Sequence, residues 1–173
     1  MDPIANEVFE RLNAMGIAFR QMSHPAAATM EYCRAVEAAF DAVMPKNIFL
    51  TPRNGSAYYL LITRPNARYK TSDISKQLGS ARLSFAPQDK LYEFLRCTPG
   101  AITPMGLLFD EGRVVKLAVD SALREAETLA FHPCINTMSL AMSGSDFFDK
   151  YLPDIGWEPI FVEIHDFLND EDA

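Results

Sequence analysis

The chain has 173 residues, of which 49% are hydrophobic and 23% are charged, and its formal net charge is −7. This composition is typical of a globular protein in water, and the length suits one domain, residues 1–173, around a single core. No apolar run reaches the ~20 residues that a membrane-spanning helix needs, and the acidic N-terminus lacks the pattern of a signal peptide. We therefore expect a cytoplasmic protein without a membrane partner.

The cysteines and histidines are scattered without the spacing of a metal site. Cys33, Cys97 and Cys134 include no CxxC pair, and their odd number gives no disulfide framework. The glycine motifs of nucleotide-binding proteins, GxGxxG and GxxxxGK(S/T), are absent as well. The residues themselves thus give no support for a metal or a nucleotide cofactor.

Basic side chains are concentrated in the middle of an otherwise acidic chain. Residues 46–90 carry a net charge of +6, which leaves −13 for the rest. The cations of this window are Lys46, Arg53, Arg64, Arg68, Lys70, Lys76, Arg82 and Lys90. Taken alone, the overall negative charge argues against a nucleic-acid partner. The window, however, could form a basic face that attracts a phosphate-bearing ligand, or it could be a chance cluster of solvated charges.

The first third of the chain predicts two helices, a strand and a hairpin. Asp2-Pro3 is a cap and first-turn pair for a helix that Gly16 ends. Residues 17–22 predict a strand, and Thr29 caps a second helix that Pro45 stops. Residues 47–50 and 58–62 then predict a hairpin, because Asn54-Gly55 between them is a strong turn signal.

The rest of the chain predicts short helices between strands. We expect helices or helical turns from Thr71 or Ser72 to Gly79, over 88–95 after Pro87, over 121–125, and from Ser143 or Ser145 to Tyr151. We expect strands over 81–85, 107–109, 114–119, 127–131, 135–142 and 157–164, with 107–109 and 114–119 forming a second hairpin. The predicted fold class is α/β (α+β), one compact domain with a mixed, largely antiparallel sheet surrounded by helices.

Two segments carry the strongest chemical pattern. In Pro99-Gly100-Ala101-Ile102-Thr103-Pro104, two prolines bracket a glycine, which predicts a rigid loop whose backbone N–H groups can meet a carbonyl or an anion. In the segment 131–137, His132, Asn136 and Thr137 place an imidazole, an amide and a hydroxyl close together in an apolar run. Together with Lys46, these segments suggest a site.

These residues resemble a known family. Four segments carry the resemblance, in the order and spacing of that family. They are Lys46-Asn47-Ile48-Phe49-Leu50, Ser75-Lys76-Gln77-Leu78-Gly79, the loop 99–104, and His132-Pro133 followed by Asn136-Thr137. Over residues 3–164 the chain is similar to the YbaK/prolyl-tRNA editing-domain family, most of all to its free-standing alanyl-tRNA(Pro) deacylases, the PrdX/ProX group. The resemblance implies a compact α/β fold and hydrolysis of the ester of a mischarged tRNA, with no metal or organic cofactor. It implies tRNA as partner, prolyl-tRNA synthetase as a further candidate partner, and no DNA.

The resemblance also assigns roles to residues. Gly100 matches the glycine of the family's GxxxP loop, whose backbone would lie against the ester carbonyl, and Lys46 matches the strand lysine that would hold a phosphate or that carbonyl. His132 would orient water, bind the ribose or accept a proton. Each also has a structural interpretation: a turn glycine, a surface lysine and a buried histidine bonded to backbone.

The amino-acid pocket is expected to be small and apolar. A site shaped for proline cannot strongly exclude a smaller residue, because the missing methylenes are worth only ~1–3 kcal/mol, so a second site must remove the error. Candidate walls are Met30, Ile102, Met105 and Leu140, and the expected substrate-binding set is Met30, Ile102, Thr103, Pro104, Asn136 and Thr137. Asn136 and Thr137 would bind the terminal ribose or the amine, or else brace the loop.

Other readings of the function stay open at this point. The chain could be a deacylase of the same family for cysteinyl-tRNA(Pro) or seryl-tRNA, or a non-catalytic module that binds tRNA or a synthetase. Cys134 is not expected to be a nucleophile, since it lacks a recognisable paired base. The loop of His24 could border the site, but His24 is interpreted as a loop histidine whose ring is satisfied locally.

Overall fold

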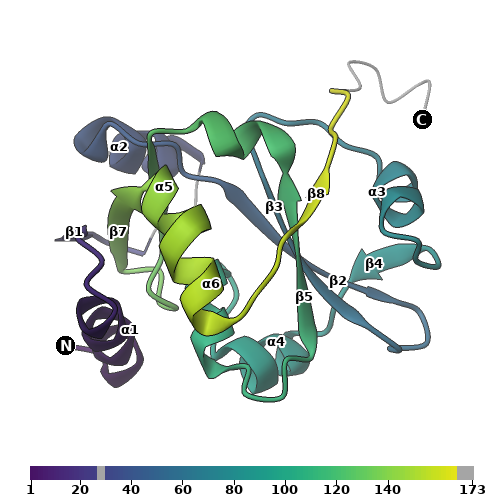
Figure 1. The fold of residues 1–173 in the computed structure, drawn as a ribbon, viewed down its shortest axis with the longest axis horizontal. Coiled ribbons are helices and arrows are strands. Elements are labelled where there is room, and N and C mark those ends of the chain that lie inside the picture. Colours follow the sequence, from purple (N-terminus) through teal and green to yellow (C-terminus); the bar gives the residue numbers. More distant parts are fainter. Residues whose placement is uncertain (27–29, 167–173) are drawn as a thin grey trace.

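The structure, a computed structural model, describes residues 1–26 and 30–166, and its strands form two sheets (Figure 1). The smaller sheet has the order β1 (Arg20–Ser23), β7 (Met138–Ser143), β6 (Thr128–Phe131). The larger has the order β4 (Leu83–Phe85), β2 (Lys46–Pro52), β3 (Tyr58–Thr63), β5 (Val115–Asp120), β8 (Ile160–Val162). Among these strands, β3–β5 and β5–β8 pair parallel and the other neighbours antiparallel, so the predicted mixed, largely antiparallel α/β fold is confirmed.

Helices lie on both sides of the sheets. They are α1 (Pro3–Ala14), α2 (Met30–Phe40), α3 (Thr71–Gln77) and α4 (Gln88–Leu95), followed by the 3₁₀ helices η1 (Pro104–Phe109) and η2 (Ser121–Glu125). The last helical stretch is continuous, with α5 (Gly144–Asp146), the π-helical η3 (Phe147–Tyr151) and α6 (Leu152–Ile155). No helix in the described part of the chain is both long and apolar enough to cross a membrane.

Two predicted caps are confirmed by hydrogen bonds. Asp2 Oδ1 accepts the N–H of Ile4 at 2.8 Å, and Ser143 Oγ accepts the N–H of Asp146 at 3.0 Å. Thr29 lies outside the described residues. The helix after it ends at Phe40, before Pro45, and the helix expected from Thr71 or Ser72 has Lys70 in the capping position, without a side-chain bond.

A bridge between Val43 and Leu129 joins the two sheets. Val43 N–H donates to the Thr128 carbonyl at 2.9 Å, and Ala130 N–H donates to the Val43 carbonyl at 2.9 Å. The bridge is parallel, so both chains leave it in the same direction. Lys46 lies three residues after Val43, and His132 lies three residues after Leu129. Because the two segments run parallel, Lys46 and His132 lie toward the same end of the bridge.

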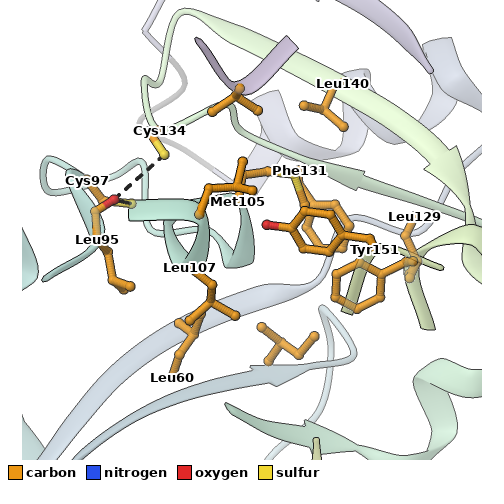
Figure 2. Packing of buried hydrophobic residues seen from close by; sticks show 14 of the residues in the cluster. Leu60, Leu95, Cys97, Met105, Leu107, Leu129, Phe131, Cys134, Leu140 and Tyr151 are labelled. Carbon is orange, nitrogen blue, oxygen red and sulfur yellow. Dashed lines mark hydrogen bonds between the residues drawn. The ribbon is translucent and has the colours of Figure 1, made fainter. Parts of the chain in front are cut away.

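The core has a large cluster on one side of the sheets and two smaller ones on the other. Alternate residues of a strand point to opposite faces. In β2, Phe49 belongs to the large cluster, while Ile48 and Leu50 pack with Ile74 of α3. In β6, Phe131 belongs to the large cluster (Figure 2), while Ala130 packs with residues of α2. Helices α2 and α3 therefore cover the same side of the joined sheets.

The predicted hairpin of 107–109 with 114–119 is wrong. Residues 104–109 form η1, and β5 pairs parallel with β3 and β8 instead. Thr103 caps η1 by accepting the Met105 N–H at 3.2 Å, and Pro104 occupies its first turn. The apolar run 105–108 is buried on every side, and such a run has no periodicity that distinguishes a strand from a helix.

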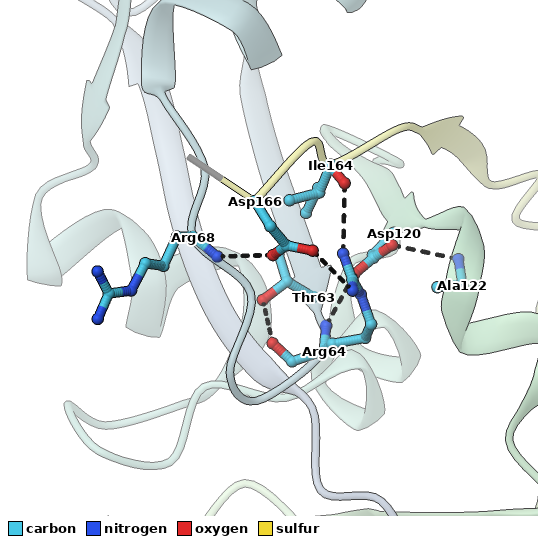
Figure 3. A network of polar contacts seen from close by, with 7 residues as sticks. All are labelled: Thr63, Arg64, Arg68, Asp120, Ala122, Ile164 and Asp166. Atoms are coloured by element: carbon cyan, nitrogen blue, oxygen red, sulfur yellow. Dashed lines mark hydrogen bonds and ion pairs between the residues drawn. The ribbon is translucent and has the colours of Figure 1, made fainter. Parts of the chain in front are cut away.

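A polar network fastens the ends of β3 and β5 to the segment that follows β8 (Figure 3). The buried carboxylate of Asp120 accepts from Arg64 Nε at 2.8 Å and from the Arg64 backbone N–H at 3.0 Å. Arg64 Nη1 also lies 3.0 Å from Asp166 Oδ2. Asp166, held by Arg64 and by the Arg68 N–H, has its pKa lowered, first of all by the bond from that N–H.

Candidate functional site

Pro99 and Gly100 form the corner of an exposed turn. Gly100 has φ +84°, and the Ala101 N–H donates to the Thr98 carbonyl at 3.0 Å, which is the arrangement of a type II turn with proline and glycine in the central positions. The backbone N–H groups of Gly100 and Ile102 make no hydrogen bond within residues 1–26 and 30–166. The turn can therefore offer N–H donors to a carbonyl oxygen.

The other end of this loop is fixed in the core. Thr103 is fully buried, and its hydroxyl is used to cap η1. The carbonyl of Pro104 accepts the hydroxyl of the buried Tyr151 at 2.8 Å. An exposed turn on a rigid base suits precise placement of backbone donors. It also gives Thr103 and Pro104 structural contacts in addition to the substrate contact expected for them.

The turn at Gly100 meets the segment 132–137. A Cβ atom built on Gly100 would lie 3.6 Å from Nδ2 of Asn136, so the amide of Asn136 faces this glycine. Thr137 is exposed, and its carbonyl accepts the His24 N–H at 2.9 Å. The two segments that the sequence singled out are thus brought together.

His132 lies at the end of β6 with only 6% of its surface exposed. Its Nδ1 is 2.8 Å from the Met138 carbonyl oxygen, which can only accept, so the neutral ring carries its proton on Nδ1 and a lone pair on Nε2. Burial lowers the pKa of His132 below its ordinary 6.5, the Met138 contact opposes this, and the nearby His24 lowers it further. His132 is therefore a neutral ring at pH 7, and its Nε2 lone pair accepts no hydrogen bond from any described residue.

The structure brings His24, whose loop the sequence left as a possible border of the site, into contact with Ser139, a residue that sequence reasoning missed. His24 Nε2 lies 2.8 Å from Ser139 Oγ, and that oxygen lies 3.5 Å from His132 Nδ1. His24 Nδ1 lies 2.8 Å from the Pro25 carbonyl oxygen, so in the neutral ring Nδ1 donates, Nε2 accepts, and the Ser139 hydroxyl donates to Nε2. The hydroxyl then offers only its lone pairs to His132. Nothing in the sequence links positions so far apart; only the β1–β7 pairing does.

Lys46 is the exposed first residue of β2 and pairs with Thr63. By strand alternation it leaves the sheet on the face of Ile48 and Leu50. Ser139 and His132 follow the alternation of Ala141 and Ala130, which face α2. Lys46 and the two histidines thus lie on the same side of the joined sheets, although no direct contact joins Lys46 to Gly100 or His132 within the described residues.

The apolar residues expected to line the pocket differ in their accessibility. Ile102 is half-buried and packs against the large cluster beside the turn. Met105 and Leu140 are fully buried members of that cluster. The side chain of Met30 lies outside the described part of the chain. Ile102 is accordingly the candidate wall that the structure places at the surface next to Gly100.

Cys134 is a buried thiol with a left-handed backbone, φ +67°. Its Sγ lies 3.8 Å from the Leu95 carbonyl, and Cys97 Sγ contacts the same oxygen at 3.4 Å (Figure 2). Contact with Cys97 and burial raise the pKa of Cys134 well above its ordinary value. A thiol held protonated is a poor nucleophile. In the described part of the chain, no three His, Cys, Asp or Glu residues are grouped as metal ligands.

The sequence profile of the aminoacyl-tRNA editing domain matches residues 24–150, which include His24, Lys46, Gly100, His132 and Ser139. The chain belongs to the aminoacyl-tRNA editing domain family. It is 28% identical over 139 residues to the prolyl-tRNA editing protein ProX of Acetoanaerobium sticklandii, covering 80% of this chain and 85% of that one. It is 31% identical over 160 residues to the mouse prolyl-tRNA synthetase associated domain-containing protein 1, covering 90% and 94%.

Solved structures agree on the fold of this editing domain. A crystal structure of a protein described as a candidate trans-editing enzyme for prolyl-tRNA synthetase superposes with a TM-score of 0.71. The match covers 95% of this chain and 98% of that one at 14% sequence identity. The fold predicted from the resemblance is thereby confirmed.

Proposed function

We propose that this editing domain is a free-standing deacylase that hydrolyses the ester of mischarged alanyl-tRNA(Pro). The observation that carries the proposal is the approach of Asn136 to Gly100, which joins the glycine turn to the segment containing His132. Membership of the editing-domain family and the name of ProX support the tRNA substrate. Alanine is the amino acid that the resemblance to the PrdX/ProX deacylases implies, and Ile102 supplies an apolar side chain beside the turn.

The chemistry requires only positioned hydrogen bonds. The N–H groups at Gly100 and Ile102 would hold the ester carbonyl oxygen and stabilise its developing negative charge, an effect worth ~3–4 kcal/mol per donor. A water molecule attacks the carbonyl carbon, the bond to the ribose oxygen breaks, and the ribose leaves as a hydroxyl. His132 Nε2 would accept a hydrogen bond from that water or from the neighbouring ribose hydroxyl.

Lys46 and Asn136 would complete the contacts. Lys46 would hold a phosphate of the terminal nucleotide as a compact point charge. Asn136 would bind the ribose or the free amine of the alanyl group. Cys134 takes no part, because its thiol is buried and protonated.

A panel of mischarged tRNAs tests the proposal directly. The protein is incubated with alanyl-, cysteinyl- and seryl-tRNA, and ester loss is compared with the spontaneous rate. We expect alanyl-tRNA(Pro) to be hydrolysed fastest. Faster hydrolysis of another ester would reassign the amino acid, and no hydrolysis of any would favour a binding module.

Variants of Lys46 and Gly100 connect the activity to this site. Lys46→Ala should lower kcat/KM roughly 10- to 100-fold, as for loss of one charge-assisted hydrogen bond. Gly100→Ala has room for its Cβ but places alanine at φ +84°, a strain of about 1–2 kcal/mol. Gly55→Ala is the matched control, because Gly55 has φ +66° at the distant β2–β3 turn. Of the two glycine variants, only Gly100→Ala should lose activity.

A further inference from the structure

A cleft beside α3 is lined by cations and hydroxyl groups, and none of its lining residues within 1–26 and 30–166 is a carboxylate. Its charged members come from the loop before the helix, from the helix and from the loop after it. The principal lining residues are Lys70, Thr71, Ser72, Lys76, Ser80 and Arg82. In a chain with a net charge of −7, such a group of cations marks a place where an anion is favoured.

The cleft is built on a fixed frame. Ser75 Oγ donates to the Thr71 carbonyl at 2.7 Å and accepts the Leu83 N–H at 3.1 Å, which ties α3 to the start of β4. Ile74 is fully buried against β2. Lys76 and Arg82 project from this frame, both exposed, and neither forms an ion pair with a carboxylate in the described part of the chain.

The cleft and Lys46 lie on the same face of the larger sheet. Helix α3 covers the face of the larger sheet on which Ile48 and Leu50 lie, and Lys46 leaves β2 on that same face. The cations of the cleft and Lys46 therefore lie on the same side of the larger sheet, the cleft beside β4 and Lys46 at the other end of β2, toward His132. A ligand with a row of phosphates fits this layout better than a single anion does.

We propose that the cleft beside α3 binds the sugar–phosphate backbone of the tRNA acceptor arm while the aminoacylated 3′ end lies at Gly100 and His132. The inference rests on the function proposed above and assigns the tRNA contact to a definite surface. Contacts to phosphates fix position without reading bases. Binding at this cleft is accordingly tolerant of tRNA sequence and sensitive to salt.

The test uses the double variant Lys76→Ala/Arg82→Ala. Its control is Arg11→Ala/Lys150→Ala, which removes the same charge from elements on the opposite side of the sheets. Affinity for uncharged tRNA(Pro) is measured over a series of salt concentrations, and thermal unfolding confirms that both variants fold. Deacylation is measured on alanyl-tRNA(Pro) and on the alanyl ester of adenosine, which has no phosphate backbone.

We expect the cleft variant to bind tRNA at least about fivefold more weakly, with a salt slope lower by roughly one for each cation removed. Its KM for alanyl-tRNA(Pro) should rise with kcat retained, and its rate on alanyl-adenosine should match wild type. Equal tRNA affinity and salt slope in wild type, cleft variant and control would overturn the proposal. If wild type hydrolyses neither ester but the cleft variant still weakens tRNA binding, the deacylase function fails and the docking surface stands.

Discussion

The hydroxyl oxygen of Ser139 lies 2.8 Å from Nε2 of His24. The same oxygen lies 3.5 Å from His132 Nδ1, so one hydroxyl stands between two imidazoles whose ring centroids are 5.9 Å apart. When both rings are neutral, backbone carbonyls accept their Nδ1 protons, and this sets the direction of every bond in the group. We infer that Ser139 is a positioning residue for His132.

Replacing Ser139 with alanine tests that role. The Ser139→Ala variant should lower kcat of deacylation about three- to tenfold with little change in KM, because the imidazole keeps its Met138 contact but loses a second constraint. Steady-state kinetics on alanyl-tRNA(Pro) measure the split between kcat and KM. Ser145→Ala, an exposed serine on α5, is the control and should behave as wild type. Unchanged kcat in Ser139→Ala would remove Ser139 from the mechanism.

The lowered pKa of His132 predicts how activity depends on pH. Only the neutral ring can accept a hydrogen bond at Nε2. We therefore expect kcat/KM to be constant near pH 7 and to decrease as the pH is lowered, with the midpoint of the decrease below pH 6.5. Since His24 contributes to the lowering, His24→Ala should move this midpoint to higher pH. The pH dependence of kcat/KM is measured for wild type and for His24→Ala. An unchanged midpoint in the variant would show that His24 does not influence the pKa of His132.

The same shift predicts a stability change. The unfolded state binds the proton of His132 more tightly than the folded state does, so folding stability falls as the pH drops from 6.5 through the lowered pKa. Denaturant unfolding of wild type and His132→Gln, compared across this range, measures the effect. The variant should lose less stability between neutral and acidic pH than wild type loses.

Cys134 should be dispensable for catalysis. Cys134→Ala should keep kcat within about twofold while costing roughly 1–2 kcal/mol of unfolding free energy through the lost packing. In the native protein, a thiol reagent should label the half-buried Cys33 before the buried Cys97 and Cys134. Rapid labelling of Cys134, with loss of activity that follows it, would restore the nucleophile hypothesis.

Asp120 should matter for stability and not for chemistry. Asp120→Ala leaves the Arg64 guanidinium and backbone N–H without their buried acceptor and should cost about 2–4 kcal/mol. Asp166→Ala removes the more exposed carboxylate on the same arginine and should cost clearly less. Chemical denaturation compares the two, and equal losses would contradict this ranking.

The parts of the fold that follow from local signals were predictable from sequence. Pro87 marks the start of α4 at Gln88, and Asn54-Gly55 marks the turn between β2 and β3. The strand predicted over 107–109 is wrong because these residues end an apolar run, 105–109, that is largely buried and has no period to distinguish a strand from a helix. The parallel partners of β5 also have no local signal, since β3 and β8 lie far from it in the chain.

The candidate site divides in the same way. Lys46, Gly100 and His132 could be proposed from sequence because each belongs to a recognisable short segment of the family pattern. His24 could be placed only in a loop that could border the site, and Ser139 had no distinguishing neighbour at all. Both were assigned only when strand pairing placed Ser139 opposite Met22 and so next to His24.

That pairing also fixes when the site can form during synthesis. The contact between His24 and Ser139 spans 115 residues, and within the described residues β1 pairs only with β7. Because a ribosome delivers the N-terminal segments first, β1 must wait, unpaired, until almost the whole chain has emerged. Closing so long a loop comes late and slowly. The contact between His24 and Ser139 is consequently expected to form late in folding, and for the proposed deacylase we expect that nascent chains ending before β7 do not hydrolyse aminoacyl-tRNA.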